Sequence, residues 1–225
     1  MVNAMIVTID GPAGSGKSTA ARRLAQRLGF RFLDTGAMYR AVALAALRAK
    51  LDWADSPGLA ALARQLAIDV DECLVLLNGE DVSLAVRTPE VTAVTRYAAD
   101  HPEVRAHLVE QQRRLGDQGN VVTEGRDQGT VVFPQAECKF FLTAANEVRA
   151  RRRASEMAAR GQAADVEDVL QKQNARDEQD RSRPVGPLAQ ASDALEIDTS
   201  EMTEDEVVAH LEGLVRRKMD EIGRR

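Results

Sequence analysis

The fold of this chain is decided by the stretch Met5-Ile6-Val7-Thr8-Ile9-Asp10-Gly11-Pro12-Ala13-Gly14-Ser15-Gly16-Lys17-Ser18. Its beginning predicts a strand, and its end follows the pattern G-x-x-x-x-G-K-S at the start of a helical segment. The glycines allow successive backbone N–H groups to face a polyphosphate, and the N-terminus of the helix adds to the attraction. Lys17 can then reach the β- and γ-phosphates, and the Ser18 hydroxyl is the expected Mg²⁺ ligand. The stretch predicts a P-loop for ATP made of Gly11, Pro12, Ala13, Gly14, Ser15, Gly16, Lys17, Ser18 and Thr19.

The composition predicts one soluble globular domain. The chain has 225 residues, of which 44% are hydrophobic and 29% charged, and its net charge of −5 argues against nucleic-acid binding. Cys73 and Cys138 are isolated, which argues against a disulfide scaffold or a cysteine metal site. Neither a signal peptide nor a membrane-spanning run is visible. We therefore expect a cytoplasmic protein without a membrane partner, and a monomer because no apolar stripe indicates an interface.

The order of hydrophobic segments predicts a parallel sheet flanked by helices. Strands are expected at 5–9, 30–33, 120–124, 138–142 and 194–197, and helices at 20–28, 37–50, 55–66, 102–116, 146–160 and 165–180, from 89 and from 203. Asn78-Gly79 lies between two short strand-like runs and predicts a type I′ hairpin, which is antiparallel.

We therefore predict an α/β fold of the P-loop type: a three-layer arrangement of a parallel sheet between helices, with a small antiparallel insert and a helical lid. The whole chain, 1–225, forms a single P-loop kinase domain. Its core is expected at about 1–59 and 91–225, the insert at about 60–90 and the lid at about 149–180.

Arginines in loops and at helix ends separate this chain from other P-loop proteins. The N-K-x-D sequence by which GTPases read their base is absent. Phosphoryl transfer requires positive charge around the phosphates, and an acceptor that is itself a phosphate requires more of it. Arg40 and Arg126 each follow an expected strand end, where active sites of open α/β sheets form. The other candidates are Arg87, Arg105, Arg149, Arg152, Arg153, Arg176, Arg181 and Arg183.

A helix, a break at Gly161 and a second helix form the predicted lid. Arginines stand on both helices, as expected for a segment that closes over a triphosphate and excludes water. The alternative is an exposed charged hairpin in which residues such as Glu147 and Glu156 form weak surface ion pairs with these arginines.

Several further motifs resemble those of the bacterial cytidylate kinases, a family of P-loop nucleoside monophosphate kinases. The resemblance covers nearly the whole chain. Its motifs are Asp10 to Ser18, Leu33-Asp34-Thr35-Gly36-Ala37-Met38-Tyr39-Arg40, Val86-Arg87-Thr88, Val104-Arg105, Glu124-Gly125-Arg126-Asp127, Gly129 to Pro134 and Arg176 to Arg183. It implies the reaction ATP + CMP → ADP + CDP, with dCMP as a second acceptor and Mg²⁺ as the cofactor, and it makes the antiparallel insert a monophosphate-binding insert.

The resemblance also implies roles for single residues. Arginines 40, 126 and 183 match residues that hold the acceptor phosphate, while Asp127 and Arg105 match residues that read cytosine. Positions 176 and 180 match residues near the ribose, and position 35 matches a hydroxyl beside the acceptor. The implied CMP site is therefore Thr35, Arg40, Arg105, Arg126, Asp127, Arg176, Asp180 and Arg183, and the implied catalytic cations are Lys17, Arg126, Arg153 and Arg183.

Two positions depart from the family pattern. Arg96 stands where the family commonly has a base-binding serine, and Gln128 replaces an apolar residue. The alternatives left open are a P-loop kinase for another acceptor, such as UMP or a shikimate-like hydroxyl, and a nucleotide-binding switch ATPase.

Overall fold

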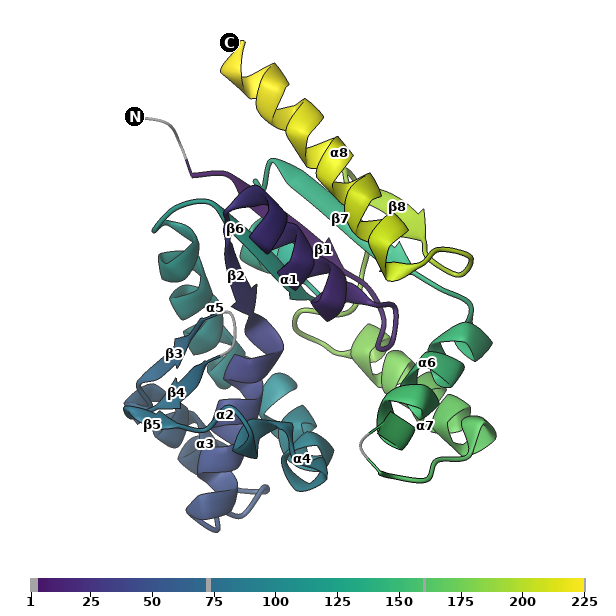
Figure 1. Cartoon of the computed structure of the whole chain (residues 1–225). Coiled ribbons are helices and arrows are strands. Elements are labelled where there is room, and N and C mark those ends of the chain that lie inside the picture. Colours follow the sequence, from purple (N-terminus) through teal and green to yellow (C-terminus); the bar gives the residue numbers. More distant parts are fainter. Residues whose placement is uncertain (1–3, 72–73, 160, 225) are drawn as a thin grey trace.

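The computed structural model describes residues 4–71, 74–159 and 161–224. At its centre is a five-stranded sheet in the order β2-β6-β1-β7-β8 (Figure 1). The strands are β1 Ile6–Asp10, β2 Arg31–Asp34, β6 Val121–Gly125, β7 Cys138–Thr143 and β8 Leu195–Asp198. Every pair in this sheet is parallel, so the carboxyl ends of β1, β2 and β6 lie at one edge, with Asp10 beside Gly125 and Asp34 beside Glu124.

Helices cover both faces of the sheet, which confirms the predicted three-layer α/β fold. On one face, α1 (Lys17–Leu28) and α8 (Glu204–Gly223) pack on the strands, and Leu24 and Leu211 meet Val7 and Ile9 in one buried cluster. On the other face, α5 (Pro102–Gly116) contributes Val104 and Leu108 to a second cluster. Strands buried on both faces favour apolar side chains, and β1 and β6 begin with the pairs Ile6-Val7 and Val121-Val122 before their polar carboxyl ends.

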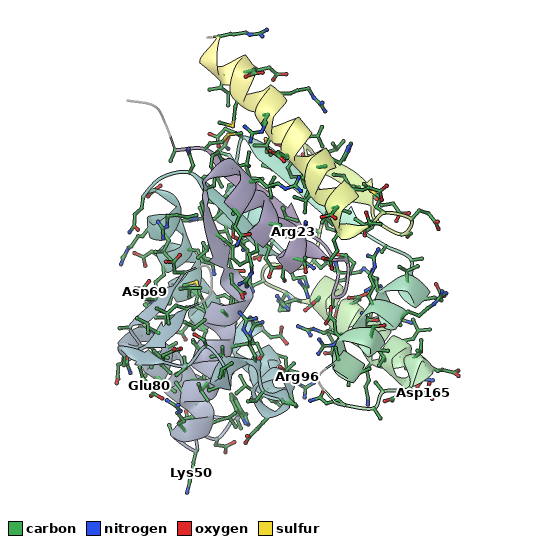
Figure 2. The ribbon with its side chains drawn as sticks, in the orientation of Figure 1. Arg23, Lys50, Asp69, Glu80, Arg96 and Asp165 are labelled. Carbon is green, nitrogen blue, oxygen red and sulfur yellow. The ribbon has the colours of Figure 1, made fainter. Side chains whose placement is uncertain are left out.

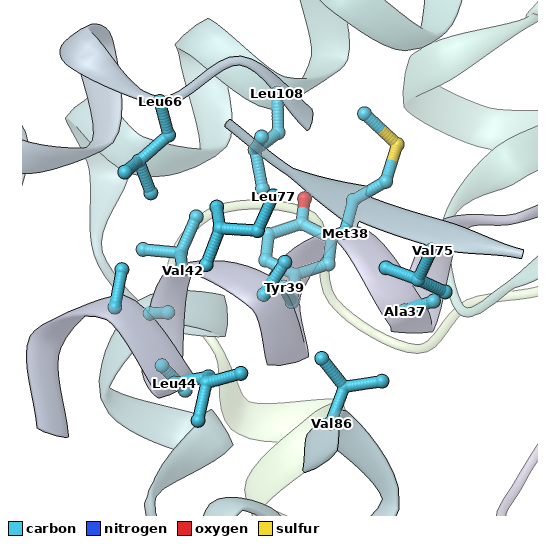
Figure 3. Packing of buried hydrophobic residues seen from close by; sticks show 14 of the residues in the cluster. Ala37, Met38, Tyr39, Val42, Leu44, Leu66, Val75, Leu77, Val86 and Leu108 are labelled. Carbon is cyan, nitrogen blue, oxygen red and sulfur yellow. The ribbon is translucent and has the colours of Figure 1, made fainter. Parts of the chain in front are cut away.

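The second cluster is shared with the region that follows β2, residues 35–99, which includes the insert expected at about 60–90. This region contains α2 (Thr35–Arg48), α3 (Ser56–Gln65), the short helix η1 (Ala85–Arg87) and α4 (Pro89–Ala99) around an antiparallel sheet of β3 (Ile68–Val70), β4 (Val75–Leu77) and β5 (Glu80–Asp81). Figure 3 shows side chains of α2, including Tyr39 and Val42, packed against Leu66, Leu77 and Leu108. The hairpin prediction is confirmed, because Asn78 and Gly79 have φ of 52° and 83° between β4 and β5. The third strand, β3, was not predicted.

Two helices project from the carboxyl edge of the sheet, close to the loop between β1 and α1 (Figure 1). They are α6 (Asn146–Ala159) and α7 (Val166–Ser182), and they pack side by side. Both helices were predicted, with ends that differ by one or two residues.

The loop expected after β6 is partly helical. One turn of π-helix, η2 (Gln128–Val132), lies there. The buried Asp10 carboxylate accepts the N–H groups of Gln128 and Gly129 at 2.9 and 2.7 Å, and so holds the start of this turn. The local sequence gave no sign of it because the stabilising group lies on β1, more than a hundred residues away.

The structure bears on the predictions about membrane spans and cysteines, within the residues that it describes. None of the helices in the described part of the chain is both long and apolar enough to cross a membrane. Cys138 is a free, buried cysteine, while Cys73 lies outside the described residues.

Candidate functional site

The P-loop connects β1 to α1 and has the backbone expected of its glycines. Gly11, Gly14 and Gly16 have φ of 144°, 77° and 84°, values that favour glycine. A Cβ atom at Gly11 would also overlap the carbonyl oxygen of Leu142 on β7. The loop can therefore lie against the sheet and present its backbone at the N-terminus of α1, where an anion is favoured.

Lys17 is folded back into this loop. Its side chain is 5% exposed, and its Nζ donates a hydrogen bond to the carbonyl oxygen of Pro12 at 2.6 Å. Burial, helped by the positive charge of Arg126, lowers the pKa of Lys17 to about 7, although Glu124 and Asp10 favour its charged form. A triphosphate would bring further negative charge to this ammonium group and stabilise its proton.

We expect ATP to bind with uptake of a proton at about pH 8, where ATP is itself fully ionised. With a pKa of about 7, Lys17 is mostly neutral at that pH in the empty enzyme, and bound phosphates restore its charge. Calorimetric titration with metal-free ATP in two buffers of different ionisation enthalpy should show uptake of about one proton per site. At about pH 6, where Lys17 is already mostly charged in the empty enzyme, its contribution to the uptake should be small. Equal heats in the two buffers at the higher pH would contradict the prediction.

Ser18 and Glu124 form the oxygen pair best placed for a metal ion. The Ser18 hydroxyl donates to Oε1 of Glu124 at 2.8 Å, and Glu124 ends β6 beside the P-loop. No group of three or more His, Cys, Asp or Glu side chains that could hold a metal lies among the described residues. One hydroxyl and one carboxylate are nonetheless the donor set that suits Mg²⁺, which keeps several waters and binds substrate phosphates. Sequence analysis assigned Ser18 but not Glu124, although Glu124 stands at an expected strand end.

Asp34 gathers two arginines at the end of β2. Its Oδ1 caps α2 by accepting the N–H of Ala37 at 2.8 Å. Arg40 approaches its two oxygens at 3.2 Å, and Arg87 of η1 approaches Oδ2 at 3.3 Å. Sequence analysis named Arg87 as a loop arginine and within the motif Val86-Arg87-Thr88, but gave it no role. Its place beside Arg40 makes it a further candidate for the acceptor phosphate.

Asp180 gathers a second pair of arginines. Its two carboxylate oxygens meet Nε of Arg126 at 2.8 Å and Nη2 of Arg183 at 2.6 Å. Arg183 is also fixed by Asp100, 2.8 Å from its Nε. Burial disfavours the charged form of Asp180, but the charge of Arg126 and its hydrogen bond outweigh burial and lower the pKa of Asp180. Three of the predicted acceptor residues, from two distant segments, therefore lie together.

Two of the predicted arginines of α6 and α7, Arg153 and Arg176, differ in their surroundings. Arg176 makes no ion pair within the described residues. Burial and the positive charge of Arg126, with smaller effects of Arg40 and Arg153, lower its pKa. Arg176 therefore lies among the acceptor arginines and favours an anion beside it. Arg153 instead forms an exposed ion pair with Glu156 on its own helix at 3.0 Å. Its catalytic role remains a prediction.

Arg105 and Asp127 form a buried ion pair, with 2% and 4% of their surfaces exposed. Arg105 also donates to the carbonyl oxygen of Ala99 at 3.1 Å and lies over the ring of Tyr39, 5.5 Å from its centre. Burial raises the pKa of Asp127, while the charge of Arg105 opposes this. A paired carboxylate and guanidinium, away from water, present an acceptor and a fork of donors to one edge of a planar base.

Thr35 is buried at the start of α2, and its hydroxyl donates to the main-chain carbonyl of Glu124 at 2.7 Å. This bond links the first residue of α2 to β6. The predicted contact between Thr35 and the acceptor remains a prediction.

The two departures from the family pattern have different structural consequences. Figure 2 shows Arg96 on the side of α4 that faces α7. Its guanidinium lies 4.8 Å from the ring of Tyr97, which in turn stacks on Trp53. Gln128 is buried, and its amide accepts from Thr123 at 2.9 Å and donates to Gln112 at 3.2 Å. Gln128 therefore supports the loop that carries Asp127 from below.

Comparison with known proteins identifies the family of this chain over nearly its whole length. A family model described as "Cytidylate kinase" matches residues 7–217. The cytidylate kinase of Rhodopirellula baltica is 50% identical over 212 residues, covering 94% of this chain and 93% of that protein. The cytidylate kinase of Citrifermentans bemidjiense is 48% identical, covering 96% and 95%, and that of Mycobacterium leprae is 48% identical, covering 95% and 96%. A P-loop beside clustered arginines and a buried Arg105–Asp127 pair is thus found in a chain that belongs to the cytidylate kinase family.

Proposed function

We propose that this chain transfers the γ-phosphate of ATP to CMP, forming ADP and CDP. The observation that carries the proposal, in a member of this family, is the buried Arg105–Asp127 pair beside Arg126 and Arg183. The exocyclic amine of cytosine can donate a hydrogen bond to a carboxylate, and the neighbouring ring acceptors can receive hydrogen bonds from a guanidinium group. Uracil places an oxygen where the amine would be and would face the Asp127 carboxylate unfavourably.

The proposed transfer requires alignment and charge rather than a general base. A phosphate oxygen of CMP is already an anion and a nucleophile, but it is repelled by the triphosphate. Two pairs of arginines are available to neutralise this phosphate. Arg40 and Arg87 are gathered around Asp34. Arg126 and Arg183 are gathered around Asp180. Lys17 and the P-loop backbone hold the donor, so the charge that spreads over the transferring group remains stabilised.

Ser18 and Glu124 would hold Mg²⁺ in this scheme, because their 2.8 Å contact places a hydroxyl and a carboxylate together at the P-loop. When bound, the ion neutralises charge on the donor phosphates and orients them. The contribution of Ser18 and Glu124 would be to fix the position of the ion relative to Lys17, which directly precedes Ser18 in the chain.

A comparison of acceptors tests the proposed function. Steady-state turnover with ATP should be fastest with CMP or dCMP, at least about 100-fold slower with UMP and AMP, and absent with shikimate. The fold-change for UMP reflects one donor–acceptor mismatch in a buried site. A switch ATPase would hydrolyse ATP slowly and at the same rate with or without CMP. Inactivity on both cytidine nucleotides would refute the proposal. Use of dCMP, a cytoplasmic location and a monomeric state remain predictions from the sequence.

A further inference from the structure

A buried ion pair joins the two projecting helices beneath the P-loop. Arg149 of α6 and Asp177 of α7 lie 2.7 Å apart, between Nη1 and Oδ2, and their side chains are only 2% and 1% exposed. Charged side chains are rarely buried to this extent, because each loses its hydration and must be compensated by its partners. Such a pair therefore requires an explanation, and none of the site residues discussed so far depends on its charge.

The pair holds both backbone groups of a single P-loop residue, Ala13. The N–H of Ala13 donates to Oδ1 of Asp177 at 3.3 Å. The carbonyl oxygen of Ala13 accepts from Arg149 at 2.7 Å and from Gln173 of α7 at 3.2 Å. A Cβ atom at Gly14 would lie 2.5 Å from the Gln173 amide nitrogen, so the loop packs directly against these helices. The donor loop is thereby attached to α7.

Each nitrogen of the Arg149 guanidinium is engaged within the protein. Besides the bond of Nη1 to Ala13, Nε donates to the carbonyl oxygen of Ala144 at 3.2 Å and Nη2 donates to Asn146 at 2.7 Å. The lid was expected to supply arginines to the triphosphate from both helices. In this structure Arg149 instead serves the P-loop backbone.

Helix α7 also carries the acceptor side of the site. Arg176 directly precedes Asp177, and Asp180 follows one turn later, where it holds Arg126 and Arg183. The attachment at Ala13 therefore sets how far the donor loop lies from the arginines for the acceptor phosphate. In-line transfer depends on this spacing, and a shift of about 1 Å can reduce the rate by about 100-fold.

We propose that Asp177, together with Arg149, is a positioning residue for phosphoryl transfer: it fixes the backbone of Ala13 in the P-loop to α7 and so keeps donor and acceptor phosphates in line. The proposal rests on the proposed function. Neither side chain touches substrate in this scheme. Both act through the loop backbone and through the residues that α7 carries.

A purely structural role makes a different prediction. A buried ion pair can often be replaced by apolar side chains of similar volume without loss of stability, whereas removal of one partner strands a buried charge. The double variant Arg149→Met/Asp177→Leu therefore preserves packing and removes the bonds of both charged side chains to Ala13, leaving only the 3.2 Å bond from Gln173. The single variant Asp177→Asn keeps an oxygen that can accept the Ala13 N–H, but it removes the charge opposite Arg149. Asp168→Asn is the matched control, because Asp168 lies on the same helix in an exposed pair with Lys172.

The experiment separates binding from catalysis. For each variant, kcat is measured with saturating ATP and CMP and expressed per folded enzyme, and calorimetry gives Kd for each nucleotide alone. We expect the double variant to lose kcat by about 30-fold while both Kd values change by less than about three-fold. Asp177→Asn should fall between the double variant and the wild-type protein, and Asp168→Asn should behave as wild type.

A double variant whose kcat stays within about two-fold of wild type would overturn the proposal. Should the double variant not fold, an unchanged kcat of Asp177→Asn would overturn it equally. The wild-type protein and the control are assayed together with the variants. Absence of CMP turnover in the wild-type protein would refute the proposed function and this proposal with it, whereas active wild type with unaffected variants would refute this proposal alone.

Discussion

Replacing Asp127 by Asn is expected to reduce kcat/KM for CMP by about 100-fold and to leave kcat/KM for UMP within about three-fold of wild type. The Asp127 carboxylate is buried against Arg105 and can accept a hydrogen bond from the exocyclic amine of cytosine. An amide at this position can instead donate to the oxygen that uracil carries there. The CMP/UMP ratio should therefore fall by about 100-fold, and initial rates measured with both acceptors at saturating ATP would show it.

Asp127→Ala is the control for this substitution. Alanine also removes the acceptor for the amine, but it has no donor for uracil, so both acceptors should be used poorly. Calorimetric Kd values for ATP should be unchanged in both variants, because Lys17 and the P-loop backbone are untouched. An unaltered CMP/UMP ratio in Asp127→Asn would show that the base is read elsewhere.

Replacing Glu124 by Gln should lower kcat by about 100-fold and raise the Mg²⁺ concentration needed for half-maximal rate, with little change in KM for CMP. The amide oxygen can still accept the Ser18 hydroxyl, which lies 2.8 Å from Glu124 Oε1. The substitution therefore keeps the local hydrogen bond and removes only the negative charge that would favour a cation. Rates measured across a Mg²⁺ titration, with Mn²⁺ binding followed by electron paramagnetic resonance, would test this.

Glu137→Gln is the matched control. Glu137 also accepts a single hydrogen bond near β1, from the N–H of Ile6 at 2.8 Å, but at the opposite edge of the sheet. Its replacement should leave the Mg²⁺ dependence unchanged. Wild-type Mg²⁺ dependence in Glu124→Gln would restrict Glu124 to a role in orienting Ser18.

The sequence predicted the fold wherever local signals and burial agreed. The P-loop is read from one continuous stretch, and strands such as β1 and β6 begin as β-branched runs that end at turn residues. Asn78-Gly79 specified a hairpin by its backbone preference alone. The strand β3 was not predicted because three residues are too few to show a hydrophobic periodicity. It forms by pairing with β4. The π-helical turn after β6 escaped because Asp10 stabilises it from a distant strand.

For the site, sequence analysis identified the candidate residues more readily than their contact partners. Arg126 and Asp180 were both named, but their pairing spans 54 positions of the chain and is defined only by the fold. Glu124 was quoted within a motif and yet received no role, since its meeting with Ser18 spans 106 positions of the chain. Arg149 was grouped with other charged residues of its helix because burial is invisible in a run of arginines.

The carboxylates that hold these arginines have a consequence for how a ligand associates. Asp34, Asp127 and Asp180 already restrict the guanidinium groups of Arg40, Arg105, Arg126 and Arg183 before any nucleotide arrives. A free arginine side chain carries about 2 kcal/mol of rotamer entropy. Much of that disorder is lost when the polypeptide folds, so the incoming monophosphate meets side chains that are already arranged, and less ordering accompanies the encounter.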